Sequence, residues 1–165
     1  MNNVPTTQNK ASIFRPGEGD ILDLNGGTIT FKVTSSISNN QLGVYEITLS
    51  PKTVGAELHY HREMDETFIV NKGILTIQMS DEILEAEAGT VVYVPRLTPH
   101  SFKNNSDEDV TLTLIFNPTM GREGFFTGLK EILSEQPVDP EKFLKLYNDY
   151  DSYPSDAASM VPHKI

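Results

Sequence analysis

The chain has 165 residues, a length typical of a single domain with a buried core. It carries 23 acidic and 13 basic residues, and the resulting net charge of -10 disfavours binding to nucleic acid or to an anionic membrane surface. It contains no cysteine, which excludes disulfides, thiolate metal sites, iron–sulfur clusters and a cysteine nucleophile.

The first segment, residues 1–12, is polar and is predicted to be a flexible N-terminal segment. It lacks the apolar stretch of a signal peptide, and no other stretch reaches the length that spans a bilayer. The sequence therefore predicts a cytoplasmic protein that does not bind membranes.

Residues 13–117 are predicted to form one β-domain of short strands separated by turn residues. Apolar and polar residues alternate over residues 110–116, as expected for a strand with one buried face. Residues 67–70 and 74–79 are predicted to pair as a hairpin, because Asn71-Lys72-Gly73 between them is a typical turn. This spacing is typical of an antiparallel sandwich or barrel, and the fold class is therefore predicted as all-β.

Residues 118–165 are predicted to form a helical extension and a tail. Apolar residues recur at helical spacing over residues 124–135, and the Asp-Pro pair at 139–140 is a typical helix start, with aspartate as the cap. Both short α-helices must pack on the β-domain or on another subunit, because neither is long enough to be stable alone. The tail from residue 152 onward is predicted to be poorly ordered, with His163 solvated.

Three of the four histidines share one spacing pattern with a glutamate: His59, His61, Glu66 and His100. Residues two apart on a strand face the same side, so His59 and His61 can reach one ion. Glu66 follows at an odd offset, so the chain must turn before it and bring it back on a neighbouring strand. Three imidazoles and one carboxylate suit a divalent transition metal, namely iron, manganese, nickel, zinc, cobalt or copper, better than calcium or magnesium.

The sequence resembles the cupin family in two motifs. Residues 55–73 contain the His-x-His pair, the glutamate and a closing glycine, and residues 89–104 contain Pro95, His100 and Asn104 at the family's spacing. The resemblance implies an antiparallel double-stranded β-helix, which is the jelly-roll barrel of cupins. It also implies that the metal ligands are His59, His61, Glu66 and His100.

The same resemblance has weaker parts. The Gly-Arg-Glu-Gly-Phe-Phe stretch after the last predicted strand is similar to small, quercetinase-like cupins. Thr53 and Leu97 occupy positions where the family usually has glycine; both positions lie in turns, and Leu97 is expected to narrow the entrance to the site. The family commonly pairs, and the exposed edge strands of such a barrel need cover, so a homodimer is predicted.

Three functions are compatible with this pattern. The first is a metal-dependent, dioxygenase-like oxygenase acting on a small and mostly apolar molecule, with Glu66 as a ligand or as the catalytic base. The second is a metal-dependent isomerase, epimerase or decarboxylase that polarises a carbonyl group. The third is a small-molecule-binding protein without turnover. The substrate is predicted to contact four aromatic side chains that are equally typical of barrel core: Tyr45, Phe68, Phe102 and Phe116.

Overall fold

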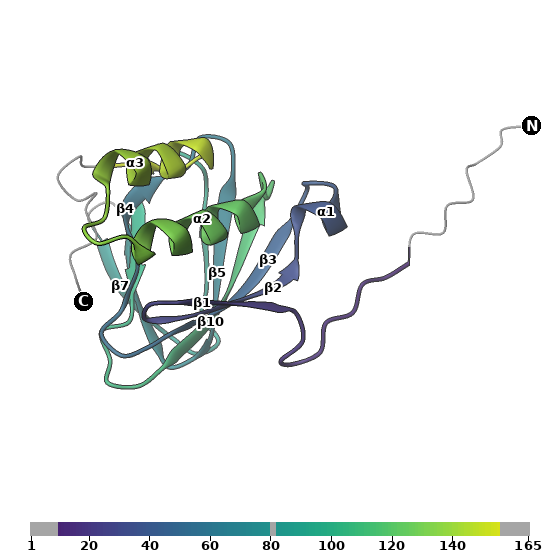
Figure 1. Ribbon diagram of the computed structural model, residues 1–165. Coiled ribbons are helices and arrows are strands. Elements are labelled where there is room, and N and C mark those ends of the chain that lie inside the picture. Colours follow the sequence, from purple (N-terminus) through teal and green to yellow (C-terminus); the bar gives the residue numbers. More distant parts are fainter. Residues whose placement is uncertain (1–9, 80–81, 156–165) are drawn as a thin grey trace, which may run out of the picture.

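The computed structural model describes residues 10–79 and 82–155, where eleven strands form two antiparallel sheets that face each other (Figure 1). The six-stranded sheet has the order β1 (Asp20–Leu24), β2 (Gly27–Val33), β3 (Gly43–Leu49), β10 (Val110–Asn117), β5 (Asp65–Lys72) and β8 (Val91–Val94). The five-stranded sheet has the order β11 (Tyr153–Pro154), β4 (Val54–Tyr60), β9 (His100–Lys103), β6 (Ile74–Met79) and β7 (Glu82–Glu87). The predicted all-β jelly roll is confirmed. Residues 1–9 of the predicted flexible segment lie outside the described residues.

The core lies between the two sheets and follows the alternation seen in the sequence. Every second residue of β3 and of β10 is buried, and the two strands pair with Leu112 opposite Ile47 and Leu114 opposite Tyr45. Strand β5 also buries alternate residues, beginning with Glu66. Each fully buried apolar side chain of this kind stabilises the fold by about 1.5–3 kcal/mol. On these three strands of the six-stranded sheet, Glu66 is the one buried residue that carries a charge, and it marks where a site can form.

The predicted hairpin between residues 67–70 and 74–79 is wrong. The turn at Gly73, with φ 80°, carries the chain from one sheet to the other, so that β5 and β6 lie in different sheets. Strand β6 pairs instead with β7 and β9. A turn signal in the sequence marks a reversal of the chain but does not select the partner of the strand that follows, because strand partners are set by packing of both faces.

Strands β1 and β7 were not predicted. Both lie at sheet edges, where most of their residues are exposed, and β7 carries a glutamate at three of its six positions. Exposed edge strands need no continuous apolar face, and charged side chains protect them from pairing with other chains. Their weak hydrophobic alternation is the reason that sequence patterning missed them.

Helices α2 (Arg122–Ser134) and α3 (Pro140–Asp149) pack across one end of the barrel, whereas α1 (Ser35–Ser38) is a single turn after β2 (Figure 1). The side chain of Asp139 accepts hydrogen bonds from two backbone N–H groups of α3, which confirms the predicted cap. Both helices bury aromatic residues. Helix α2 packs on the β-domain of its own chain, where the ring centroid of Phe126 lies 5.1 Å from that of Tyr45 on β3. Over the described ranges, no helix has the length and apolar character needed to cross a membrane.

The chain continues past α3 into ordered structure. Ser152 is fully buried, and β11 pairs with β4, with Tyr153 opposite Tyr60. The prediction of a poorly ordered tail from residue 152 onward is therefore wrong for residues 152–155. Residues 156–165, which include His163, lie outside the described residues. The predicted division into three segments stays a prediction.

Candidate metal centre

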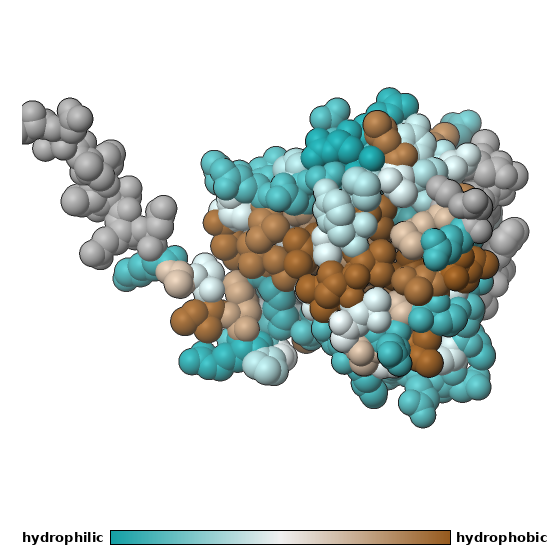
Figure 2. Space-filling view, turned by 180° about the vertical axis from the view of Figure 1, so that it is seen from behind, coloured by the Kyte–Doolittle hydropathy of each residue, from teal (hydrophilic) through white to brown (hydrophobic). Residues whose placement is uncertain are grey.

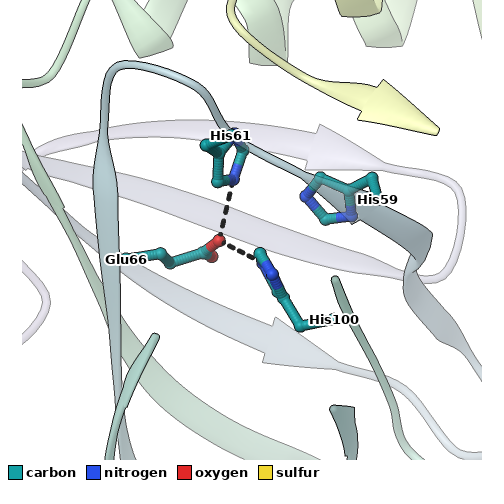
Figure 3. Close-up of side chains that lie close together, drawn as sticks. All are labelled: His59, His61, Glu66 and His100. Atoms are coloured by element: carbon teal, nitrogen blue, oxygen red, sulfur yellow. Dashed lines mark hydrogen bonds and ion pairs between the residues drawn. The ribbon is translucent and has the colours of Figure 1, made fainter. Parts of the chain in front are cut away.

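The four side chains predicted as ligands converge inside the barrel (Figure 3). His59 and His100 are opposite each other on the neighbouring strands β4 and β9, and His61 begins the turn after β4. Glu66 returns on β5, which belongs to the facing sheet and not to a strand beside β4 as predicted. The four side chains are at most 2 % exposed, and one ligand atom from each lies within 4.8 Å of the others.

Each histidine ring is oriented by a backbone carbonyl. The Nδ1 atoms of His59, His61 and His100 lie 2.7, 2.6 and 3.0 Å from the carbonyl oxygens of Glu57, Asp151 and Thr98. A carbonyl can only accept, so each Nδ1 must carry the proton and donate it. In the neutral ring the lone pair is then on Nε2, which is the arrangement that metal-binding histidines use.

The carboxylate of Glu66 faces two of these Nε2 atoms. Its Oε2 lies 3.1 Å from Nε2 of His61 and 2.8 Å from Nε2 of His100. Two lone pairs at these distances require a proton or a metal cation between them. At His100, burial alone would lower the pKa, but the Glu66 carboxylate raises it above its ordinary value, which favours a proton between Nε2 and Oε2.

Burial alone would also raise the pKa of Glu66, yet the hydrogen bonds from His100 and His61 hold it well below its ordinary value. Burial, together with the neighbouring His100 and His61, keeps the pKa of His59 well below its ordinary value, so this ring is neutral. An anionic carboxylate and three imidazoles at such distances form a donor set that can hold a divalent transition metal ion.

Asp151, which the sequence analysis missed, supports the centre from the C-terminal segment. Its backbone carbonyl accepts a hydrogen bond from Nδ1 of His61. Its carboxylate accepts hydrogen bonds from three consecutive backbone N–H groups at residues 62–64, at 2.8 to 3.0 Å. The residue is 3 % exposed. It therefore holds the turn that joins His61 to Glu66. No local pattern identifies this role, because the partners are about 90 positions apart in the chain.

A cavity of about 110 Å³ lies beside the centre, and both His59 and Glu66 line it. Of the four predicted substrate residues, Phe102 and Phe116 also line it, whereas Tyr45 and Phe68 pack outside its lining. The hydroxyl of Tyr45 donates to Glu123 at 2.9 Å, and the ring centroid of Phe68 lies 5.2 Å from that of Phe102. A substrate role for the four aromatic residues stays a prediction.

Two polar side chains of the cavity come from the helical extension and were not predicted as site residues. Arg122 of α2 and Tyr147 of α3 both line the cavity and are 4 % and 7 % exposed. Burial raises the pKa of Tyr147 to about 12, so its phenol stays neutral at physiological pH. A sequence signal for Arg122 existed: it lies three, four and seven positions before Phe125, Phe126 and Leu129, on the apolar face of the helix.

The residues at the family's glycine positions differ in their surroundings. A Cβ on Gly55 would lie 2.0 Å from the ring of Phe102, so a glycine is required there. Thr53 is 4 % exposed and lines the cavity. Leu97 adopts the left-handed conformation, with φ 68°, that glycine adopts without strain. Its side chain is 64 % exposed and is not part of the cavity lining, which gives no support to the expected narrowing of the entrance.

Residues 45–116, which include all four candidate ligands, match the family model of the Cupin_2 cupin domain. This segment of the chain is therefore similar to cupin domains. No curated protein sequence is significantly similar to this chain.

Solved structures of other proteins share the fold. KdgF from Halomonas sp. superimposes with a TM-score of 0.58 and 20 % identity over 66 % of this chain and 94 % of that one. A predicted oxalate decarboxylase from Thermotoga maritima superimposes with a TM-score of 0.57 and 17 % identity, over 64 % of this chain and 98 % of that one. A cupin-superfamily sugar phosphate isomerase from Silicibacter pomeroyi superimposes with a TM-score of 0.52 and 23 % identity, over 58 % of this chain and 61 % of that one. These similarities establish the fold of this chain and leave its reaction open.

Proposed function

We propose that this protein is an enzyme that binds one divalent transition metal ion and acts on a small organic molecule in the adjacent cavity. The ligands are His59, His61, Glu66 and His100. One observation carries the proposal: three backbone carbonyls hold the Nδ1 protons, so that three Nε2 lone pairs and a carboxylate oxygen converge within 4.8 Å.

A dioxygenase-like oxygenation is the first candidate reaction. Three imidazoles and one carboxylate leave two positions of an octahedral shell open, and a redox-active ion bound there supplies oxygen chemistry. The residues of the chain contribute an enclosed and mostly apolar space, lined by Phe102, Phe116 and side chains of α2, which excludes water from the reacting groups.

Glu66 has two proposed roles, as a metal ligand and as the catalytic base. Its carboxylate lines the cavity, which supports a proton-accepting role towards a molecule bound beside it, whereas the low pKa that His61 and His100 impose on it makes it a weak base. This role depends on the same geometry as the ligand role, because Oε2 is the atom that faces both histidines.

A second candidate is a reaction that needs the metal only as a Lewis acid, such as an isomerisation or a decarboxylation. It is favoured by the structural neighbours, which include a sugar phosphate isomerase and a predicted oxalate decarboxylase. A small-molecule carrier without turnover is the remaining alternative.

The test uses protein purified without metal and then loaded separately with iron(II), manganese(II), nickel(II) or zinc(II). Oxygen uptake and product formation are measured with flavonols, diols, keto acids and aldoses, with and without dioxygen. Oxygen consumption that matches product formation supports the oxygenase. Turnover under strict anaerobiosis supports the second candidate, and saturable binding without product under every metal supports the carrier. Failure of the protein to bind any of the four ions overturns the proposal.

A homodimer is also proposed. Apolar side chains lie on the outer face of the six-stranded sheet at Val44 and Ile115, which are opposite each other on β3 and β10, and at Ile69 and Val91, which are opposite each other on β5 and β8. Val91 is 62 % exposed, and Figure 2 shows a broad hydrophobic band across one face of the molecule. Large exposed apolar surfaces commonly mark an interface. Light scattering after size exclusion tests this state. The cytoplasmic location stays a prediction.

A further inference from the structure

Arg122 is a buried positive charge beside the candidate metal centre. It is the first residue of α2, it is 4 % exposed, and it lines the same cavity as His59 and Glu66. Its guanidinium carbon lies 3.9 Å from the ring centroid of Phe125 and 4.7 Å from that of Phe116. Burial lowers the pKa of Arg122, but a guanidinium still remains charged at neutral pH.

The hydrogen bonds of Arg122 do not neutralise this charge. Its Nη1 donates to the carbonyl of Tyr150 at 3.0 Å and to the hydroxyl of Ser152 at 2.9 Å, and both acceptors are neutral. Its Nε is buried and has no acceptor among the described residues. The carboxylate of Glu66 is hydrogen-bonded to His61 and His100 and not to Arg122, although its negative charge is near enough to raise the pKa of Arg122 against the effect of burial.

Two of the three surface arginines have a carboxylate partner, and the third, Arg62, is exposed to solvent and donates to the hydroxyl of Tyr60. The guanidinium of Arg96 forms two hydrogen bonds with Asp65, and Arg15 lies 3.7 Å from Glu18. Within the described ranges, Arg122 forms no ion pair with a carboxylate. A buried charge without a counter-ion costs several kcal/mol of stability, so a buried arginine that lacks one is well placed to bind an anion.

We propose that Arg122 binds the carboxylate of the substrate, and that the substrate is therefore a small organic acid with an apolar body. Nη1 of Arg122 is already used within the protein and Nε is shielded from the cavity, so Nη2 is the nitrogen left to donate a charge-assisted hydrogen bond to a carboxylate. This assignment rests on the proposed function in one respect, namely that the cavity beside the metal centre is the substrate site.

The cavity restricts the chemical class of the acid. Its volume of about 110 Å³ is close to that of an engineered core cavity of ~150 Å³ that accepts benzene, and phenylalanines and aliphatic residues form most of the lining near Arg122. A metal-loaded centre with one net positive charge and Arg122 together attract an anion more strongly than a neutral molecule of the same shape. A planar carboxylate on a small apolar group fits these conditions better than a large or highly charged phosphate ester.

The test compares benzoate with benzamide, which has nearly the same shape but no charge, by isothermal titration calorimetry. Wild-type protein is expected to bind benzoate at least about 10-fold more tightly than benzamide, in the metal-free as well as the metal-loaded form, because hydrogen bonds to charged groups contribute that much. Arg122→Met is expected to weaken the binding of benzoate by the same factor and to leave the affinity for benzamide unchanged. Arg15→Met is the matched control, since it removes an exposed positive charge and should change neither affinity.

A second measurement separates ligand binding from a purely structural role. Methionine places an apolar side chain among the phenylalanines, so Arg122→Met is expected to unfold at the same or a higher temperature than wild type without ligand. A lower unfolding temperature together with unchanged benzoate binding would show that Arg122 only supports the fold. Should the variant fail to fold, the wild-type comparison remains decisive: equal affinity for the two probes, or tighter binding of inorganic phosphate, overturns the proposal.

The two proposals can fail separately. A protein that binds no metal but distinguishes benzoate from benzamide through Arg122 retains the anion site and loses the proposed enzyme. A protein that binds metal and turns over a substrate, while Arg122→Met binds benzoate as wild type does, retains the enzyme and loses the anion site.

Discussion

Two parts of this protein meet at the cavity and contribute different chemistry. The barrel strands supply four metal-ligand candidates and an apolar wall, whereas the segment from α2 to β11 supplies the guanidinium of Arg122, the phenol of Tyr147 and the support of Asp151. The candidate ligands lie within the residues that match the cupin domain, and the C-terminal part lies beyond them. The comparison indicates that the candidate metal centre belongs to the part of the fold that resembles cupins, while other residues beside it come from outside that part.

The largest effect is expected from the barrel part. His59→Ala or His100→Ala removes one of the converging Nε2 atoms and should weaken metal binding by more than about 100-fold, because even losing a supporting hydrogen bond costs about 10- to 100-fold. The fold should persist, since the core around the sheets is unchanged. Metal content after dialysis, with circular dichroism for the fold, measures both. His163→Ala is the control, and the ligand assignment is wrong if it loses as much metal as His100→Ala.

An intermediate effect is expected from the C-terminal part. Asp151→Ala leaves three backbone N–H groups of the turn at residues 62–64 without their acceptor, which should lower the free energy of unfolding by about 2–4 kcal/mol. Metal affinity should fall by about 10-fold, because the same turn orients His61. Urea denaturation and metal titration provide the two values.

Asp149→Ala is a suitable control for that variant. Its side chain is 51 % exposed and pairs only with Lys145, so the free energy of unfolding should change by less than about 0.5 kcal/mol. Asp151→Asn, which tolerates the observed φ of 58° and retains one acceptor oxygen, should lie between the two. If Asp151→Ala proves as mild as Asp149→Ala, the C-terminal segment does not support the metal centre.

The smallest effect is expected at the rim of the barrel. Hydrogen bonds from Arg96 lower the pKa of Asp65 from 3.8 to about 2. Because the pKa is lower in the folded state, the pair stabilises the protein above pH 4, and this contribution is lost as the pH falls towards 2. Arg96 is 44 % exposed, so solvent limits the contribution to about 0.5–1 kcal/mol.

The measurement for this pair is the difference in the free energy of unfolding between wild type and Asp65→Asn. The difference should be present at pH 5.5 and should shrink at pH 2.5, where the carboxyl group of wild type is partly protonated. A difference that grows on acidification would show that Asp65 is not stabilised in its ionised form.

The inward-facing residues of β3, β5 and β10 were predictable because alternation along a strand is a local property. The candidate ligands were predictable from their spacing and their chemical type. The sheet that contains Glu66 was not predictable. The pattern around Gly73 indicates a turn after the strand of Glu66, but it does not indicate that the next strand, β6, pairs with β7 and β9 in the other sheet.

The position of Arg122 on the apolar face of α2 is a local signal that it is buried. The absence of an ion pair with a carboxylate could not be predicted from the sequence. Whether a guanidinium has a partner depends on every segment packed around it, including Tyr150 and Ser152 from the end of the described chain. The same holds for Asp151, whose hydrogen bonds span almost 90 positions.

Residue order was therefore sufficient to predict the barrel, its alternating core and a candidate ligand set, because these follow from short-range periodicity, from the resemblance to cupin motifs and from the coordination chemistry of imidazole and carboxylate. Long-range packing was needed to bring Glu66 across from the facing sheet, to close the barrel with α2 and α3, and to leave Arg122 buried without an anion. Burial and pairing are properties of surroundings assembled from distant parts of the chain, and no local pattern contains them.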